Sequence, residues 1–275
     1  MKYVRPKIAL TGIILAGFLY VQNNNLMVSS YTYREAVPKE LDGYVIVQVS
    51  DLQNKTFGQN HDRILQEIKE SHPDIIVITG DLLDRNKTKD LEAAISFIRQ
   101  AKNIAPIYFV SGNHEHQSGF WDELSDLLVN EGVTVLDNGK TIIEKDGLRL
   151  HILGLADYSV NPYYEEVLRT LMSDVEEGDF SILLSHRPEL FDGYARQGVD
   201  LVFSGHAHGG QIRLPFTQGL FAPNQGFFPQ YTSGVHEKAG TTMVVSRGLG
   251  NSVFPFRLFN YPELVTMRFI SYEEI

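Results

Sequence analysis

Five short polar segments of the sequence each follow directly on an apolar run, and each carries a side chain that can bind a cation. These segments are residues 50–51, 79–84, 111–115, 185–186 and 204–210. A small residue precedes each of the ligand-type side chains, which lets the backbone turn tightly there. Because ligands of open α/β sheets bind at the carboxyl ends of the strands, we expect these side chains to converge on one edge.

The donors in these segments are carboxylates, an amide and imidazoles. The chain has no cysteine, which excludes thiolate ligands and cysteine nucleophiles. Oxygen and imidazole donors suit Mn, Fe, Zn, Ni or Mg. His206 and His208 are two residues apart, and on an extended segment both rings would point to the same face. Each segment alone has a simpler interpretation as a turn or a core histidine, but five in succession favour a metal centre.

The apolar pattern predicts the elements that position these segments. Strands are predicted at residues 27–33, 44–49, 73–78, 106–110, 180–184, 200–203, 242–246 and 264–269, with a hairpin over residues 141–153. Helices are predicted at residues 60–70, 90–101, 119–130, 163–172 and 188–197. From residue 209 onward, Gly, Pro and aromatic residues indicate a long loop. The alternation of strands and helices predicts one layered α/β domain.

The order of these motifs resembles one known family. The matching residues are Asp51, Gly80-Asp81-x-x-Asp84, Gly112-Asn113-His114-Glu115, His186 and Gly205-His206-Ala207-His208. They resemble the calcineurin-like metallophosphoesterase superfamily over residues 44–270, and residues 209–212 and 246–250 resemble its bacterial membrane-associated branch. The resemblance implies a four-layer α/β/β/α sandwich with a dinuclear metal site at the C-terminal ends of the strands.

The resemblance also implies a ligand set for two divalent cations. The implied ligands are Asp51, Gln53, Asp81 and His208 for the first cation, and Asp81, Asn113, His186 and His206 for the second. Asp81 would bridge the two cations. His114, with Asn113 beside it, would act as the catalytic residue by protonating or hydrogen-bonding the leaving oxygen. Asp84 and Glu115 would orient the ligands.

Gln53 departs from the family pattern, which usually has histidine at that position. An amide is a weaker ligand than imidazole for a transition metal. We therefore expect Gln53 to bind through its amide oxygen, or to leave the position to water, so that the first cation exchanges more readily. Mn²⁺ or Mg²⁺ would tolerate this better than Zn²⁺. Among Mn, Fe, Zn and Mg, manganese is favoured.

These features predict a metal-dependent phosphoesterase that hydrolyses phosphodiesters or phosphomonoesters with water activated by the two cations. A second hypothesis is a pyrophosphatase acting on a nucleotide-linked lipid such as UDP-2,3-diacylglucosamine. A third, which Gln53 supports, is a weakly active or inactive protein that binds phosphorylated or lipid ligands. The net charge of −10 argues against a general nucleic-acid binder.

The N-terminus carries a targeting pattern. Lys2, Arg5 and Lys7 precede the uncharged apolar residues 8–21. This order predicts an uncleaved signal-anchor at the cell membrane, although the run is shorter than the roughly 20 residues that a spanning helix usually needs. The basic residues would stay in the cytoplasm and the catalytic domain outside it. The predicted parts are an anchor at residues 1–27, a connector at 28–43 and the metallophosphoesterase domain at 44–275.

Three further features each have more than one interpretation. Arg247 lies on a glycine-rich loop and could hold a phosphate group or form a surface salt bridge. His116 could touch the substrate or remain in solvent. A group of aromatic residues could wall a substrate cleft, contact lipid or pack as a hydrophobic loop. That group is Phe216, Phe221, Phe227, Phe228 and Tyr231.

Overall fold

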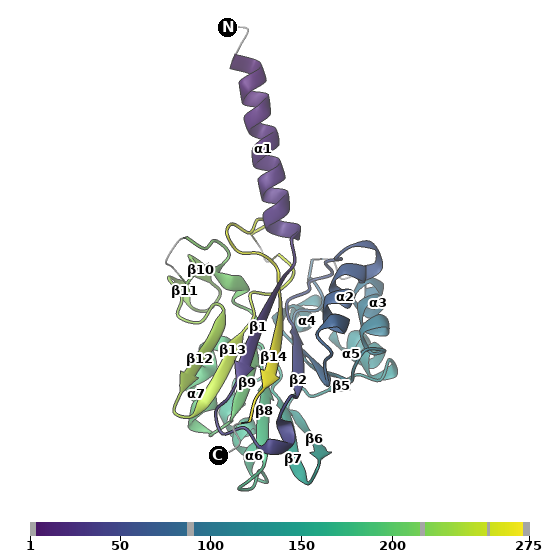
Figure 1. Cartoon of the computed structure of the whole chain (residues 1–275), viewed down its shortest axis with the longest axis vertical. Helices are drawn as coiled ribbons and strands as arrows, with labels where there is room; N and C mark the ends of the chain where they lie inside the picture. The colour runs from purple at the N-terminus through teal and green to yellow at the C-terminus, as the bar shows by residue number, and fades with distance from the viewer. Residues whose placement is uncertain (1–3, 87–90, 215–217, 252–253, 272–275) are drawn as a thin grey trace.

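Two six-stranded sheets form the centre of the computed structural model (Figure 1), which describes residues 4–86, 91–214, 218–251 and 254–271. The first sheet contains, in spatial order, β1 (Met27–Tyr33), β14 (Glu263–Phe269), β2 (Val45–Val49), β3 (Ile75–Thr79), β4 (Ile107–Val110) and β5 (Thr134–Val135). The second contains β12 (Gly234–Lys238), β13 (Thr241–Val245), β9 (Leu201–Ser204), β8 (Phe180–Leu184), β7 (Leu148–Gly154) and β6 (Gly139–Lys145). A separate hairpin pairs β10 (Phe221–Ala222) with β11 (Gly226–Phe227).

The helices cover the outer faces of the two sheets. Against the first sheet lie α2 (Asp62–Glu70), α3 (Leu91–Ala101) and α5 (Trp121–Asn130), and against the second lie α6 (Tyr164–Met172) and α7 (Phe191–Arg196). The short α4 (Asn113–Ser118) directly follows β4 and a short turn. Single 3₁₀ turns occupy Lys39–Leu41, Gln59–His61, Pro188–Leu190 and His208–Gly210.

Three apolar clusters fill the spaces between these layers. Successive residues of a strand point to opposite faces of its sheet, so Ile76 and Ile78 of β3 pack on the helices while Ile75 and Val77 pack against the second sheet. A third cluster joins the second sheet to α6 and α7 through residues such as Leu183. Each such buried side chain contributes about 1.5–3 kcal/mol to stability. The expected four-layer α/β/β/α sandwich is confirmed.

Strand direction brings the polar segments together. The strands β2, β3 and β4 pair in parallel, as do β7, β8, β9 and β13, so the carboxyl ends within each set lie at one edge. A buried side chain joins the two edges: Gln48 of β2 donates from Nε2 to Thr79 Oγ1 and to the carbonyl of Ser204 at the end of β9, each at 2.9 Å. The strand ends of both sheets therefore meet at one place.

The helix α1 (Val4–Asn24) projects from this same end of the molecule (Figure 1). Because β14 is antiparallel to β2 and β1 is parallel to β14, β1 starts where β2 ends. Several apolar side chains of α1 are more than half exposed, among them Leu10, Ile13, Ile14, Leu15 and Tyr20. Within the described residues, no helix has the length and apolar character needed to cross a membrane.

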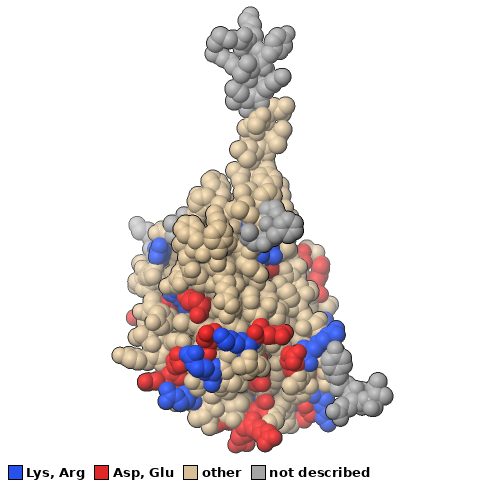
Figure 2. All heavy atoms as spheres, turned by 90° about the vertical axis from the view of Figure 1, so that its left-hand side faces the viewer, with Lys and Arg blue, Asp and Glu red and all other residues tan. Residues whose placement is uncertain are grey.

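The base of α1 is fixed to the sandwich. Gln22 and Asn23 are buried, and Gln22 Nε2 donates to the Tyr261 hydroxyl at 3.1 Å. The backbone N–H of Arg257 donates to Asn23 Oδ1 at 3.0 Å. On the face drawn in Figure 2, charged side chains gather away from α1, and few surround its base. This end of the molecule therefore combines the strand ends, a helix with exposed apolar side chains and, on the face in Figure 2, a surface poor in charge.

Candidate active site

The predicted ligands meet at the edge where the strands of both sheets end. Their placements are Asp51 and Gln53 after β2, Asp81 after β3, Asn113 at the start of α4, His186 after β8, and His206 and His208 after β9. All seven side chains are buried, with Asn113 the most exposed at 7%. The structure thus brings together every ligand that the sequence predicts.

One group of ligand atoms surrounds the position of the implied second cation. Ligand atoms of Asp81, His186 and His206 lie within 4.8 Å of one another. His186 Nε2 is 3.4 Å from Asp81 Oδ2 and 3.2 Å from His206 Nδ1. The other ring nitrogen, His186 Nδ1, lies 2.7 Å from the Thr79 carbonyl, to which it can only donate. That hydrogen bond orients the ring so that Nε2, the atom that would bind a cation, faces the centre of the cluster.

A second group surrounds the position of the implied first cation. Asp51, Asp81 and His208 offer ligand atoms that also lie within 4.8 Å of one another, and His208 Nε2 is 3.1 Å from Asp51 Oδ1. The amide nitrogen of Gln53 is 3.3 Å from His208 Nε2 and 3.4 Å from Asp81 Oδ2. Asp81 belongs to both groups, which is the arrangement that a carboxylate shared by two cations requires.

Unpartnered oxygen atoms support a cation at this place. Asp51 Oδ1, Gln53 Oε1 and Asn113 Oδ1 are buried and have no hydrogen-bond partner within the described part of the chain. A buried oxygen without a partner normally costs about 1–3 kcal/mol. Carboxylate and amide oxygens beside imidazole nitrogens form a donor set for divalent Mn, Fe, Zn or Mg. These residues therefore fit the implied pair of cations.

Several of the predicted ligand residues have a left-handed backbone conformation, which orients their side chains. Asp51 and Asp81 both have φ of 52°, and His206 and His208 have φ of 63° and 46°. Such conformations cost of order 1 kcal/mol or more for residues other than glycine, and they often occur at functional sites. The expectation that His206 and His208 share one face of an extended segment is wrong. They lie on a tight turn, and each joins a different group of ligands.

Glycines allow the ligand loops to approach closely. A Cβ at Gly80 would lie 2.6 Å from the backbone nitrogen of Gly112, and one at Gly205 would lie 2.0 Å from Ser50 Oγ. Gly80 also has φ of +86°, which side chains disfavour. These positions require glycine because two loops pass there in contact.

Burial and neighbouring charges set the protonation of the cluster. Burial raises the pKa of Asp51 to about 6, with Asp81 adding to the effect and His186 opposing it. Burial disfavours charge on Asp81 and His186 as well, but their mutual attraction lowers the pKa of Asp81 and raises the pKa of His186 to about 10. Burial and the charge of His186 lower the pKa of His206 to about 3. Asp81 is therefore anionic, and the imidazoles of His206 and His208, whose pKa burial also lowers, are neutral, while His186 carries a positive charge beside Asp81.

His114 and Glu115 support the cluster from α4. The Glu115 carboxylate accepts hydrogen bonds from the backbone N–H groups of Asp81 and Gly112, at 2.8 and 2.7 Å, and so fixes the loop that carries Asp81. His114 Nδ1 accepts the backbone N–H of Arg85 at 3.3 Å, which leaves the proton on Nε2, 3.8 Å from Asp81 Oδ2. Burial lowers the pKa of His114, against the pull of Asp81. His114 therefore presents a neutral N–H donor.

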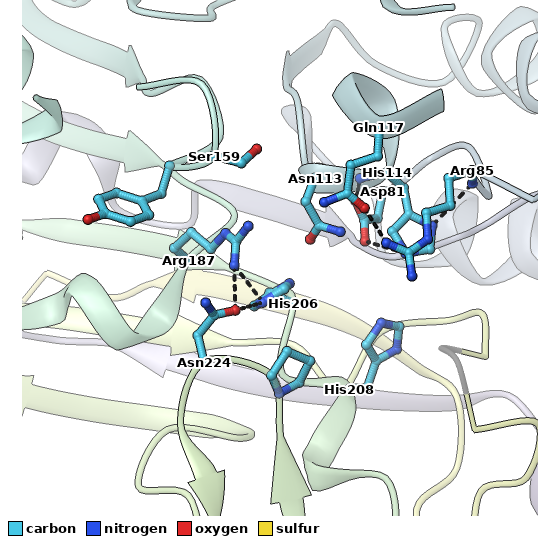
Figure 3. Close-up of a pocket in the computed structure, with 12 residues that line it drawn as sticks. Asp81, Arg85, Asn113, His114, Gln117, Ser159, Arg187, His206, His208 and Asn224 are labelled. Atoms are coloured by element: carbon cyan, nitrogen blue, oxygen red, sulfur yellow. Dashed lines mark hydrogen bonds and ion pairs between the residues drawn. The ribbon is translucent and has the colours of Figure 1, made fainter. Parts of the chain in front are cut away.

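A pocket of about 430 Å³ opens over the cluster (Figure 3). Its walls carry two arginines that the sequence reasoning missed, Arg85 beside His114 and Arg187 beside His206. The Arg187 guanidinium donates from Nε and Nη2 to both carboxylate oxygens of Asp157, at 2.5 and 2.9 Å. Asn224, from the turn between β10 and β11, completes this wall. Arg187 directly follows a ligand in the sequence, which is a signal that could have indicated it, whereas Asn224 has none.

Arg247, His116 and the described residues of the aromatic group, for which the sequence left more than one interpretation, do not line this pocket. Arg247 Nε is 3.7 Å from Glu263 Oε1, which supports the ion-pair interpretation. The His116 ring bonds to Ser111 Oγ at 2.7 Å and packs on Trp121. Of the aromatic group, Phe221, Phe227 and Phe228 are exposed on the β10–β11 hairpin, Tyr231 packs on Phe191, and Phe216 lies outside the described residues. None of the described ones lines the pocket.

Solved structures share the fold. A structure of the protein TT1561 from Thermus thermophilus aligns with a TM-score of 0.50 at 12% identity, over 75% of this chain and 90% of that one. The NAD nucleotidase of Haemophilus influenzae aligns with a TM-score of 0.51 at 14% identity, over 75% of this chain and 45% of that one. At such low identities the likeness concerns the fold alone.

Sequence comparison is more specific. The uncharacterised metallophosphoesterase YkuE of Bacillus subtilis (strain 168) is 33% identical over 251 residues, covering 89% of this chain and 86% of that protein. A transmembrane protein with a metallophosphoesterase domain from Danio rerio is 29% identical over 245 residues, 85% of this chain and 54% of that protein. A family model described as calcineurin-like phosphoesterase matches residues 44–210. This chain therefore belongs to the calcineurin-like phosphoesterases, a family of metal-dependent hydrolases of phosphoric esters.

Proposed function

We propose that the chain hydrolyses phosphomonoesters or phosphodiesters with two divalent cations held by the seven residues around Asp81. The observation that carries this proposal is the pair of ligand groups that overlap in Asp81 alone. Asp51, Gln53 and His208 would complete the first cation site. Asn113, His186 and His206 would complete the second. Mn²⁺ is the preferred ion, because an amide at position 53 suits a hard cation.

The cations and the protein groups around the pocket would have separate roles in hydrolysis. The cations, when bound, would supply positive charge that lowers the pKa of water and offsets charge on the phosphoryl group. His114 would donate from Nε2–H to the leaving oxygen, since its Nδ1 is occupied by the Arg85 backbone. Glu115 keeps Asp81 in place through the backbone. The Arg85 guanidinium, on the pocket wall, would hold a phosphoryl oxygen.

Hydrolysis of bis(p-nitrophenyl) phosphate and p-nitrophenyl phosphate with added Mn²⁺ tests the proposal. Asp81→Asn should lose nearly all turnover and bind fewer than two cations by elemental analysis, because it serves both sites. Asp62→Asn, an exposed aspartate on α2, should behave like the wild type. Two bound cations without turnover on either substrate would favour the hypothesis of an inactive phosphate-binding protein.

We also propose that the chain works at the cell membrane with its catalytic domain outside the cytoplasm. Support comes from the basic and then apolar N-terminal sequence and from the exposed apolar side chains of α1. The pocket and α1 belong to the same end of the molecule, and the surface around the base of α1 is poor in charge on the face in Figure 2. A phosphoester or pyrophosphate-linked lipid is the substrate class that such a location would favour.

Flotation of the full chain with liposomes of phosphatidylglycerol and phosphatidylethanolamine tests the location. The wild type should float, and Ile13→Lys with Ile14→Lys should reduce the floating fraction several-fold, because each charge in an apolar lipid contact costs a few kcal/mol. Val129→Lys, at an exposed site on α5, is the control. A wild type that remains with the soluble fraction would contradict the membrane proposal and leave the hydrolase proposal intact.

A further inference from the structure

We propose that Asn224 is a positioning residue that holds His206 in the tautomer able to bind the second cation. The inference rests on the metal site proposed above and adds a residue to it. Asn224 lies 18 positions after His206 in sequence, outside every motif that the family resemblance contains. Its side chain reaches the outer edge of the His206 ring in the wall of the pocket (Figure 3).

The Asn224 amide oxygen lies between two nitrogen atoms. It is 2.7 Å from Arg187 Nη1 and 3.0 Å from His206 Nε2. A carbonyl oxygen has two lone pairs and can accept from both. Accepting from His206 requires the ring proton to be on Nε2, which leaves the lone pair on Nδ1. That Nδ1 is the atom that faces His186 Nε2 at 3.2 Å, inside the ligand group of the second cation.

Arg187 favours the opposite tautomer. Its Nη1 is only 2.8 Å from His206 Nε2, close enough to donate to that nitrogen if it carried a lone pair. The ring proton would then be on Nδ1 and would point at the ligands Asp81 and His186. A guanidinium is always protonated, so Arg187 offers only donors. The Asn224 oxygen is thus the acceptor that offsets Arg187 at Nε2 and favours the metal-binding tautomer.

Asp157 holds Arg187 in the position from which it can donate to His206 Nε2. The Nε and Nη2 atoms of Arg187 are bound by both oxygens of Asp157, and the arginine side chain is buried. A bidentate guanidinium–carboxylate pair has a rigid geometry. Arg187 therefore stays beside His206 if the amide oxygen of Asn224 is removed, and its Nη1 gains the ring nitrogen as its new acceptor.

The hairpin supplies Asn224 in a conformation that suits this role. Ala222 pairs with Gly226 across the turn, and Asn224 has φ of 61°, a value that asparagine and glycine accept more readily than other residues. Gln225 holds the hairpin separately, since its amide exchanges hydrogen bonds of 2.7 and 2.9 Å with the backbone of Tyr231. The two neighbouring side chains can therefore be tested independently.

The test uses the full chain with ¹⁵N-labelled histidine rings, both free of metal and loaded with diamagnetic Zn²⁺. In the wild type, the ring of His206 should show a protonated Nε2. Asn224→Gly keeps the backbone conformation, removes the acceptor and should move the proton to Nδ1. Removing a partner of a metal-binding histidine typically lowers metal affinity about 10–100-fold, and the second cation should weaken by that much. Asn224→Asp retains the acceptor and should retain both properties.

Gln225→Ala is the matched control, because it weakens the hairpin without touching His206. Asn224→Gly with an unchanged tautomer and unchanged affinity would overturn the inference. So would an equal loss in Gln225→Ala, which would assign the effect to the hairpin. The tautomer of the metal-free chain can be read whether or not the wild type hydrolyses phosphate esters, so failure of the proposed function is a separate outcome.

Discussion

Gln53 lies where the family resemblance leads us to expect a histidine. Its side chain is 2% exposed, and its amide lies against Asp81 and His208, two groups of the proposed first cation site. Its Oε1 has no hydrogen-bond partner among the described residues. A half-turn of the amide exchanges its nitrogen and oxygen, so the same side chain can direct an oxygen at a cation. The position therefore suits a ligand, though a weaker one than imidazole.

Gln53→His should bind the first cation more tightly and shift its preference from Mn²⁺ toward Zn²⁺, because imidazole is the softer donor. Competition between the two ions, followed by elemental analysis and turnover, measures this. Gln66→His, at an exposed position of α2, controls for an added surface histidine. A variant unchanged in both affinity and turnover would mean that position 53 is not a ligand.

His114 and His116 provide a second comparison at this scale. Both lie on α4, but His114 lines the pocket while His116 bonds to Ser111. His114→Asn should lower kcat about 10²–10⁴-fold, the usual effect of a lost proton donor, and should leave two bound cations. His116→Asn should retain most of the activity. Equal losses in the two variants would remove His114 from the catalytic role.

At the scale of elements, strands that are buried on both faces were the most predictable. Such strands are continuously apolar, and β8 was predicted with the observed bounds of residues 180–184. By contrast, β12 was missed because it is an edge strand with half-exposed and exposed residues, and β10 and β11 have only two residues each. The pattern also missed α4, whose buried residues are Asn113, His114 and Glu115 instead of apolar ones.

The candidate site was also predictable only in part. Each residue predicted as a ligand follows a buried strand, so the sequence pattern indicated the whole cluster. Arg187 and Asn224 could not be assigned, because their roles depend on contacts between segments that are distant in the chain. Asp157 likewise acquires its role only from the guanidinium it binds.

The close contact between the loops that follow β3 and β4, at Gly80 and Gly112, gives a prediction about stability. Gly80→Ala should destabilise the fold by a total of about 2–4 kcal/mol, from a left-handed backbone and an overpacked contact. Gly132→Ala has the same φ of +86° but nothing within 4 Å of the added Cβ, so it should lose only the backbone part, about 1 kcal/mol. Chemical denaturation measures the free energy of unfolding of both variants. Equal losses would show that the contact between the two loops tolerates a methyl group.

At the scale of the whole molecule, the buried carboxylates link stability to metal and pH. Burial raises the pKa of Asp51 from 3.8 to about 6. An acid with a raised pKa contributes its full stability below its ordinary pKa and loses that contribution as the pH rises through the folded value. The loss from Asp51 is on the order of 3 kcal/mol. Bound cations would offset it by pairing with the carboxylate.

Removal of metal should therefore lower the melting temperature by several degrees more at pH 7.5 than at pH 5. Thermal unfolding with EDTA and with Mn²⁺ at both pH values measures the two differences. Asp51→Asn should reduce the dependence on pH, because the amide cannot ionise. An equal effect of EDTA at pH 5 and pH 7.5 would contradict the role of buried charge.

The pairing of β1 with β14 determines how late in translation the first sheet can form. Met27 lies opposite Glu263, and the base of α1 is bound to Arg257 and Tyr261. On the ribosome, α1 and β1 emerge well before these partners, which are translated more than 230 residues later. Since β14 also lies between β1 and β2, the sheet that carries Asp51 is completed only then. The α1 helix is thus available to other contacts during translation, before its base is fixed to the finished sandwich.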